Sequence, residues 1–182
     1  MQHQTIFTEK DLELPLAAYD IQREVSDFED KKKVIENWIA QIQSGRIDSQ
    51  KEEALQADFL NRIFGDVLAY DYRNPDKWLL EKELKTPIDG TKTDGGLGYF
   101  RMVEGKKDFA DVRVAIELKD GRTNLDKKQN RKGDNRTPVA QGFGYASKFG
   151  EACKWVIISN FKEIRLYNKE LGQTRYESWN IT

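Results

Sequence analysis

The apolar run VRVAIEL, residues 112–118, is the feature that most constrains the fold of this chain. Its β-branched content is typical of a buried strand. The run ends in Glu117, Leu118 and Lys119, and a turn signal at residues 120–121 follows. Because side chains alternate along a strand, Glu117 and Lys119 share one face while Leu118 points to the other. Burying a charge is costly unless it is paired or binds a metal, so this strand end is a candidate site.

The tripeptide ELK occurs twice, at Glu83–Lys85 and at Glu117–Lys119, in a chain whose residues are 34% charged. The first copy lies in WLLEKELKT, where the charges begin earlier and the pattern favours an exposed strand. Only the second copy follows an apolar run. The alternative is that Glu117 and Lys119 form an ordinary surface pair at a strand that has reached solvent.

Composition limits the kinds of site that the chain can hold. At 182 residues it is long enough for one domain with a core. A single cysteine, Cys153, and a single histidine, His3, exclude an internal disulfide and a zinc site built from Cys and His. Any metal would therefore be bound by oxygen. We find no apolar run of about 18 residues and no signal-peptide pattern, so we expect no membrane contact and a cytoplasmic location. We also expect no organic cofactor in this chain.

Helical and strand-like patterns predict an α/β (α+β) fold with a mixed central sheet flanked by helices. Residues 25–45 and 49–70 carry apolar side chains at helical spacing, and Ser49 suits the N-cap of the second helix. We expect a helical extension over residues 1–48 and a second part over 49–182, forming one compact unit. Strands are predicted at 78–85, 97–103, 112–118, 153–160, 163–169 and 176–182, with one helix at 138–149 after the third strand.

Asp94 lies just before the second predicted strand, in TKTDGGLGYF among glycines that we expect to be flexible. If this strand lies beside residues 112–118, Asp94 and Glu117 share one metal-sized gap. Carboxylate oxygens are the ligands that Mg²⁺ prefers, and a nearby lysine stabilises developing negative charge, as phosphodiester hydrolysis requires. Asp108 and Asp111 are alternatives to Asp94. We rank both lower because they leave little room for a hairpin before the strand.

The predicted helix PVAQGFGYASKFG places Gln141 and Tyr145 on one face, four residues apart. Glycine weakens a helix and often marks close backbone approach, which applies to Gly142 and Gly144. Gln141 and Tyr145 therefore have the chemistry to contact phosphate or metal-bound water near the site. The alternative is an ordinary helix whose polar residues cover the sheet.

The segment from Lys119 to Arg136 contains seven Lys or Arg against three Asp, a local charge of +4 in a chain of net charge −1. Neutralising phosphates requires several cations together, so this segment is a candidate DNA-contacting loop. A solvated loop is the alternative. The predicted phosphate contacts are Lys127, Lys128, Arg131 and Lys132.

Taken together, Asp94, Glu117-x-Lys119 and Gln141-x-x-x-Tyr145 resemble the motifs of the PD-(D/E)xK nuclease superfamily. The Gln-x-x-x-Tyr element is similar to the branch that includes nucleases of bacterial recombination helicases. More narrowly, residues 50–170 resemble the N-terminal nuclease region of type IIG restriction-modification enzymes, single chains that fuse nuclease, adenine methyltransferase and target recognition. The resemblance implies a restriction-endonuclease-like core.

The resemblance also implies roles for individual residues. Asp94 matches the first metal-binding acid, although Thr93 stands where the family name has proline. Glu117 matches the second metal ligand, with Leu118 offering its backbone carbonyl, and Lys119 matches the catalytic lysine.

Members of the superfamily often add an acid from the first core helix, and Glu52 or Glu53 suits this role. Glu52 is favoured because it is in register with Leu55 and Phe59. A solvated helix start is the alternative for both acids.

The activity implied is Mg²⁺-dependent hydrolysis of double-stranded DNA, with Mn²⁺ able to substitute. Methyltransferase and target-recognition domains are then expected C-terminal to this sequence, which contains neither an Asn-Pro-Pro-Tyr motif nor a glycine-rich cofactor loop. A stand-alone nuclease is the alternative to a piece of a longer chain. Two other functions stay open: a catalytically silent DNA-binding or scaffolding module, and a repair or phage nuclease unrelated to methylation.

Overall fold

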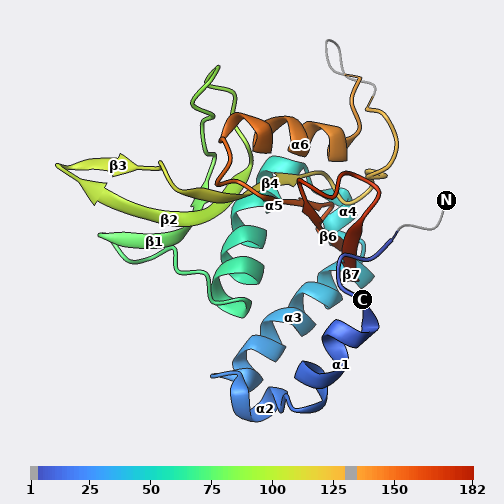
Figure 1. The fold of residues 1–182 in the computed structure, drawn as a ribbon. Coiled ribbons are helices and arrows are strands. Elements are labelled where there is room, and N and C mark those ends of the chain that lie inside the picture. Colours follow the sequence, from blue (N-terminus) through green and yellow to red (C-terminus); the bar gives the residue numbers. More distant parts are fainter. Residues whose placement is uncertain (1–3, 130–134) are drawn as a thin grey trace.

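A seven-stranded mixed sheet forms the centre of the computed structural model, which describes residues 4–129 and 135–182 (Figure 1). The strand order is β1-β2-β4-β5-β6-β7, with β3 paired to β2. β4 and β5 are parallel, and the other neighbours are antiparallel. The strands are β1 (Lys77–Lys82), β2 (Gly95–Val103), β3 (Lys106–Asp108), β4 (Val112–Leu118), β5 (Trp155–Ser159), β6 (Glu163–Asn168) and β7 (Tyr176–Asn180). The predicted mixed sheet is confirmed.

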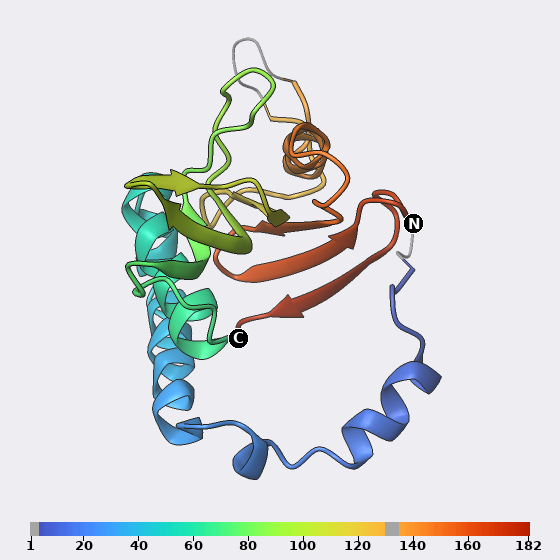
Figure 2. The same ribbon diagram turned by 60° about the vertical axis from the view of Figure 1, so that its left-hand side comes forward.

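Helices cover both faces of this sheet, which confirms the predicted α+β class (Figures 1 and 2). On one face lies α6, which packs on β4 and β5. On the other face lie α3, α5 and the π-helical segment η1, which continues α5 without a break. The helical segments are α1 (Glu9–Ala17), α2 (Ile21–Glu24), α3 (Phe28–Gln43), α4 (Arg46–Ser49), α5 (Glu52–Phe59), η1 (Leu60–Val67) and α6 (Pro138–Lys148).

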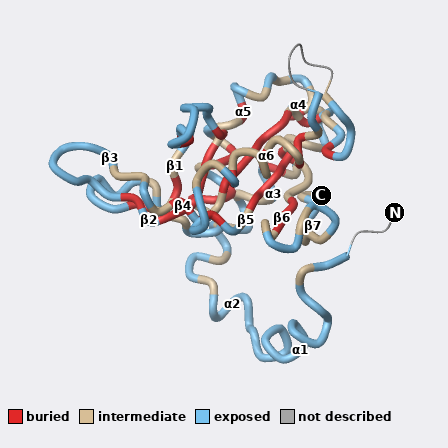
Figure 3. Tube along the Cα trace, turned by 45° about the horizontal axis from the view of Figure 1, so that its top comes forward, coloured by how far each residue is buried: buried red, intermediate tan, exposed pale blue. Residues whose placement is uncertain are grey.

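β4 separates two hydrophobic cores, and its alternation determines what each receives. Ile116 and Leu118 are fully buried in the core under α3, α5 and η1, together with Phe59. Ala115 belongs to the core under α6, together with Val156. Figure 3 shows the buried backbone concentrated along these central strands. Glu117 therefore points toward α6, and its side chain is buried between the sheet and this helix.

The N-terminal helices differ in how they pack on this body. No residue of α1 or α2 is buried, and Figure 2 shows them in an arm that runs from beside β7 to α3. By contrast, Trp38 of α3 is fully buried, and its Nε1 donates a hydrogen bond to the Phe161 carbonyl at 2.8 Å. None of the described helices is long and apolar enough to cross a membrane.

Two expectations about helix and strand boundaries are wrong. Ser49 is the last residue of α4 and donates to the Arg46 carbonyl at 2.8 Å, so it does not cap α5, whose N-cap is Lys51. The strand predicted over residues 78–85 ends at Lys82, because Glu83 adopts a positive φ of 53°.

A fourth strand before α6 was not predicted. β3 pairs with β2 through a tight turn in which Glu104 and Gly105 have φ values of 49° and 75°. Positive φ at both central residues is the conformation of a two-residue hairpin turn whose twist suits the strands. This turn lies before Asp108 and Asp111, so it does not affect the reason for ranking those two acids below Asp94: only residues 109–111 separate β3 from β4.

The glycines of α6 give a matched pair for testing its packing. A Cβ at Gly142 would lie 2.4 Å from Ile158 Cδ1, whereas one at Gly144 would meet only the Arg136 Nη1 tip at 2.8 Å. We expect Gly142→Ala to lower the free energy of unfolding by about 1–3 kcal/mol through overpacking. Gly144→Ala should raise it by up to about 1 kcal/mol through helix propensity, because the arginine side chain can move. Urea unfolding of both variants measures this; equal changes would contradict the close packing of α6 on β5.

Candidate active site

Asp94 and Glu117 lie side by side because β2 and β4 are paired. Gly95 is opposite Ile116 in this antiparallel pair, so the residues just outside it, Asp94 and Glu117, are neighbours. The Leu118 backbone N–H also donates a hydrogen bond to Asp94 Oδ2 at 2.6 Å. The structure thus brings together the two acids that the sequence singled out, although β3 separates their strands along the chain.

The backbone of Asp94 is fixed from two directions. Its carbonyl accepts hydrogen bonds from the Glu83 N–H at 3.0 Å and from Gln56 Nε2 at 2.9 Å. Gln56 was not among the predicted residues. Its position four residues after Glu52 on the same helix face was the available signal. These contacts tie α5 and the residue after β1 to the backbone of Asp94, so the position of this backbone is determined by the fold.

Glu117 and Lys119 form a buried pair at the end of β4. Glu117 is 2% exposed and Lys119 is 1% exposed. The Lys119 ammonium donates to Glu117 Oε1 and to the Leu118 carbonyl, the latter at 2.9 Å. The alternative of an ordinary surface pair is therefore wrong for this copy of ELK.

The first copy of ELK has the opposite environment. Glu83 and Lys85 are exposed, and Glu83 pairs with Lys92 at 2.8 Å, also at the surface. Only Leu84 is buried. Two identical tripeptides thus differ because one begins inside the central strand β4 and the other follows β1, at the edge of the sheet.

Electrostatics at the buried pair favour binding of a proton or a cation. The pKa of Glu117 is raised to about 8, chiefly by burial; the negative charges of Asp94 and Glu52 also raise it, whereas Lys119 lowers it. Glu52 therefore lies within electrostatic range of Glu117, as its predicted role requires. Glu53 is exposed in the same helical turn, and no corresponding effect on Glu117 is seen from it.

The donor atoms at this position are oxygens. Within residues 4–129 and 135–182, no group of three or more His, Cys, Asp or Glu side chains is arranged to hold a metal ion. What the strand end offers is two adjacent carboxylates, Asp94 and Glu117, and the carbonyl of Leu118. This set matches Mg²⁺, which binds through one or two carboxylates and retains several waters.

Gln141 and Tyr145 lie on the neighbouring helix and contact each other. Gln141 Nε2 donates to the Tyr145 hydroxyl at 3.1 Å, and Gln141 Oε1 accepts from Gln129 Nε2 at 3.1 Å. A Cβ at Gly142 would come within 3.5 Å of the Glu117 Cβ, so α6 packs directly over the buried pair. Gln141 and Tyr145 thus connect the helix beside Glu117 to the segment of residues 119–136, called here the basic segment.

The alternative acids lie elsewhere. Asp108 pairs with Arg101 at 3.1 Å in the β2–β3 hairpin, and Asp111 pairs with Arg113 at 2.5 Å. Both acids come before Val112, at the end of β4 opposite Glu117. Neither is placed to share a cation with Glu117.

Of the predicted phosphate contacts, Lys127 and Lys128 are exposed on the basic segment that follows β4. Arg131 and Lys132 lie outside the described residues.

The glycines after Asp94, which were expected to be flexible, are buried strand residues of β2. A Cβ on Gly96 would lie 2.4 Å from Leu84 Cδ1, so tight packing explains that glycine.

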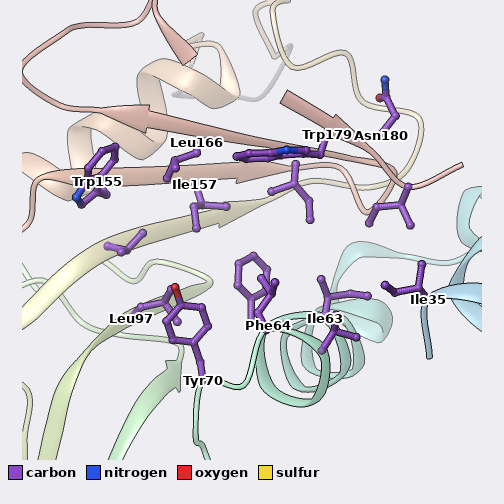
Figure 4. Close-up of a pocket in the computed structure, with 15 residues that line it drawn as sticks. Ile35, Ile63, Phe64, Tyr70, Leu97, Trp155, Ile157, Leu166, Trp179 and Asn180 are labelled. Carbon is purple, nitrogen blue, oxygen red and sulfur yellow. The ribbon is translucent and has the colours of Figure 1, made fainter. Parts of the chain in front are cut away.

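An apolar cavity lies away from this site (Figure 4). It has a volume of about 590 Å³ and lies between the sheet and η1, on the face opposite α6. Its lining includes Phe64, Ile157 and Leu166 and contains no ionisable Asp, Glu, Lys, Arg or His. Such a surface lacks the groups that phosphate or metal binding requires.

Comparisons of this chain with known protein families, curated proteins and solved structures find no match. The resemblance to PD-(D/E)xK nucleases therefore stays a prediction.

The twin tripeptides provide a matched test of the buried pair. Lys119→Ala would leave Glu117 buried without its partner, and we expect a loss of about 3 kcal/mol in the free energy of unfolding. Lys85→Ala removes an exposed charge and should change it by less than about 0.5 kcal/mol. Urea unfolding at neutral pH measures both.

The double variant Glu117→Leu/Lys119→Met serves as the control, because replacing a whole buried pair by apolar residues is often neutral. It should recover most of the stability that Lys119→Ala loses. Equal stability of Lys119→Ala and Lys85→Ala would show that Lys119 is not held in the buried pair.

Proposed function

We propose that this chain is a magnesium-dependent DNA endonuclease of the PD-(D/E)xK type, acting in a restriction-modification protein. The observation that carries the proposal is the position of the Asp94 carboxylate beside the buried Glu117–Lys119 pair. Perturbed ionisable groups at a strand end are typical of catalytic sites.

The residues present fit a hard divalent cation. Asp94, Glu117 and the Leu118 carbonyl would hold Mg²⁺, and Mn²⁺ can substitute because it accepts the same oxygen ligands. When bound, Mg²⁺ supplies polarisation of a phosphate oxygen and lowers the pKa of water. The Lys119 ammonium already bridges Glu117 and the Leu118 carbonyl, which shows that this position favours positive charge.

The chain's own groups have distinct tasks in this proposal. Lys119 stabilises the negative charge that develops on phosphate when water attacks, and burial strengthens that interaction. Glu52 adds negative charge near the cation. Gln141 and Tyr145, which are linked to the basic segment through Gln129, orient the DNA backbone beside the site.

The proposed substrate is double-stranded DNA, and the basic segment with Lys127 and Lys128 supplies phosphate contacts independent of base sequence. Recognition of a base sequence and adenine methylation are assigned to domains C-terminal to this sequence. The proposal places the protein in the cytoplasm with its DNA, and it needs no organic cofactor.

A second candidate function is a DNA-binding or scaffolding module without catalysis. One observation favours it: Glu117 and Lys119 are bonded to each other and almost fully buried, as in a structural ion pair. The two functions differ in what happens when the adjacent acid, Asp94, loses its charge.

Asp94→Asn and Asp108→Asn distinguish these functions in the longest natural chain that carries this sequence. Asn at position 94 can still accept from the Leu118 N–H, so the fold should be kept while the metal ligand is lost. We expect cleavage of unmethylated DNA in Mg²⁺ to fall by at least about a hundredfold. Asp108 belongs to a surface pair, so Asp108→Asn should cleave within about twofold of the parent.

Initial rates on supercoiled DNA measure cleavage, and thermal melts verify that both variants fold. If the two variants cleave at equal rates, Asp94 has no part in the reaction. DNA binding by the parent with no cleavage in Mg²⁺ or Mn²⁺ would support the module without catalysis.

A further inference from the structure

The first part of the basic segment, Asp120–Gln129, is docked on the body of the protein. Its single apolar residue, Leu125, is 2% exposed and packs in the core under α6. Gly121 is buried so tightly that a Cβ there would lie 2.8 Å from Asp48 Oδ1 and 2.9 Å from Ile47 Cγ2 of α4. The Thr123 carbonyl accepts from Asn160 Nδ2 at 3.0 Å. A freely solvated loop does not have such anchors.

Arg165 of β6 makes the strongest of these attachments. Its guanidinium donates to both carboxylate oxygens of Asp126, Nη1 to Oδ1 at 2.7 Å and Nη2 to Oδ2 at 3.0 Å. Nε donates to Glu163 Oε1 at 2.6 Å. The Arg165 side chain is 8% exposed, whereas that of Asp126 is 65% exposed. A bidentate contact of this kind fixes orientation as well as distance, so it determines how the segment is presented.

Between the anchors, cationic and polar side chains surround a hollow of about 470 Å³. It is lined by Asp120, Arg122, Thr123, Asn124, Lys127, Lys128 and Gln129. Three of these residues carry positive charge against one acid, Asp120. The hollow begins one residue after Lys119, and Gln129 connects it to Gln141 of α6. Its position is therefore next to the proposed site of cleavage.

We propose that this hollow is a preformed subsite for a backbone phosphate of DNA beside the cleaved bond, with Arg165 as its positioning residue. The inference rests on the proposed function for the identity of the ligand as DNA. Arg122, Lys127 and Lys128 neutralise the phosphate, while Thr123 and Asn124 offer hydrogen-bonding groups. Because the segment is already anchored, little conformational entropy is lost on binding. Arg165 acts through Asp126 and does not touch the phosphate.

The test is binding of a fluorescent DNA duplex, without divalent metal, over a series of salt concentrations. Each phosphate contact contributes about one unit to the slope of log K against log salt. We expect Arg122→Ala and Lys127→Ala to lower the slope by about one each. Arg165→Met should lower the slope by at least one, although Arg165 does not line the hollow. Arg165→Lys should restore part of the slope.

Asp126→Asn is a second variant that weakens the anchor at an exposed residue, so it provides the same test if Arg165→Met does not fold. The matched control is Arg113→Met, which breaks the Arg113–Asp111 pair away from the hollow. It should leave the slope unchanged. A purely structural role of Arg165 would lower thermal stability without altering the slope of the folded protein.

The outcomes separate the subsite from the nuclease proposal. Reduced slopes in the Arg122, Lys127 and Arg165 variants support the subsite, even if the parent fails to cleave and the endonuclease proposal is lost. Cleavage by the parent together with unchanged slopes overturns the subsite alone. Absence of DNA binding by the parent overturns both.

Discussion

The buried contact between Lys119 and Glu117 is the interaction on which the surrounding structure depends. Removing two charges from water costs several kcal/mol per ion, and only good geometry with further hydrogen bonds offsets this. The structure provides both: Lys119 also bonds the Leu118 carbonyl, and its own N–H donates to the Ser159 carbonyl at 2.8 Å. Gly142 allows α6 to close over the pair. The packing of α6 on β4 and β5 thus encloses the pair.

The same enclosure strengthens the electrostatic interactions of the pair. Away from water, an ammonium and a carboxylate interact more strongly with any charge that approaches them. Burial already raises the pKa of Glu117, and the nearby acids Asp94 and Glu52 raise it further, so the position favours a positive ligand. Replacing such a pair by apolar residues of similar volume is often close to neutral for stability. The charges, together with a second acid bonded to the adjacent backbone, are the reason that we propose a functional role for this strand end.

Local features of this site were predictable from the sequence. The alternation of residues 112–118 was sufficient to predict that Glu117 and Lys119 share a face, since alternation needs no tertiary information. Separating the two ELK copies required only the apolar run before the second. The proximity of Asp94 followed from one assumption about strand pairing, which the β2–β4 register confirms.

The features that the sequence did not reveal depend on long-range contacts. β3 consists of Lys106–Asp108, residues of low strand propensity that pair because a tight turn presents them to β2. Ser49 satisfies the rule for an N-cap, but α4 extends over it. The anchoring of the basic segment depends on Arg165, 39 residues from Asp126. Charge composition left both a DNA-contacting loop and a solvated loop open there, and only the folded chain shows where the arginine lies.

The most direct test of the account is the location of a bound cation. Crystals of the protein soaked in Mn²⁺ and measured by anomalous diffraction should show a peak shared by the carboxylate oxygens of Asp94 and Glu117 and the Leu118 carbonyl. Crystals of Asp94→Asn, treated identically, should lack that peak. An ordered parent site with no peak between Asp94 and Glu117, or with Mn²⁺ bound only elsewhere, would contradict the claim that this strand end is a metal-dependent catalytic centre.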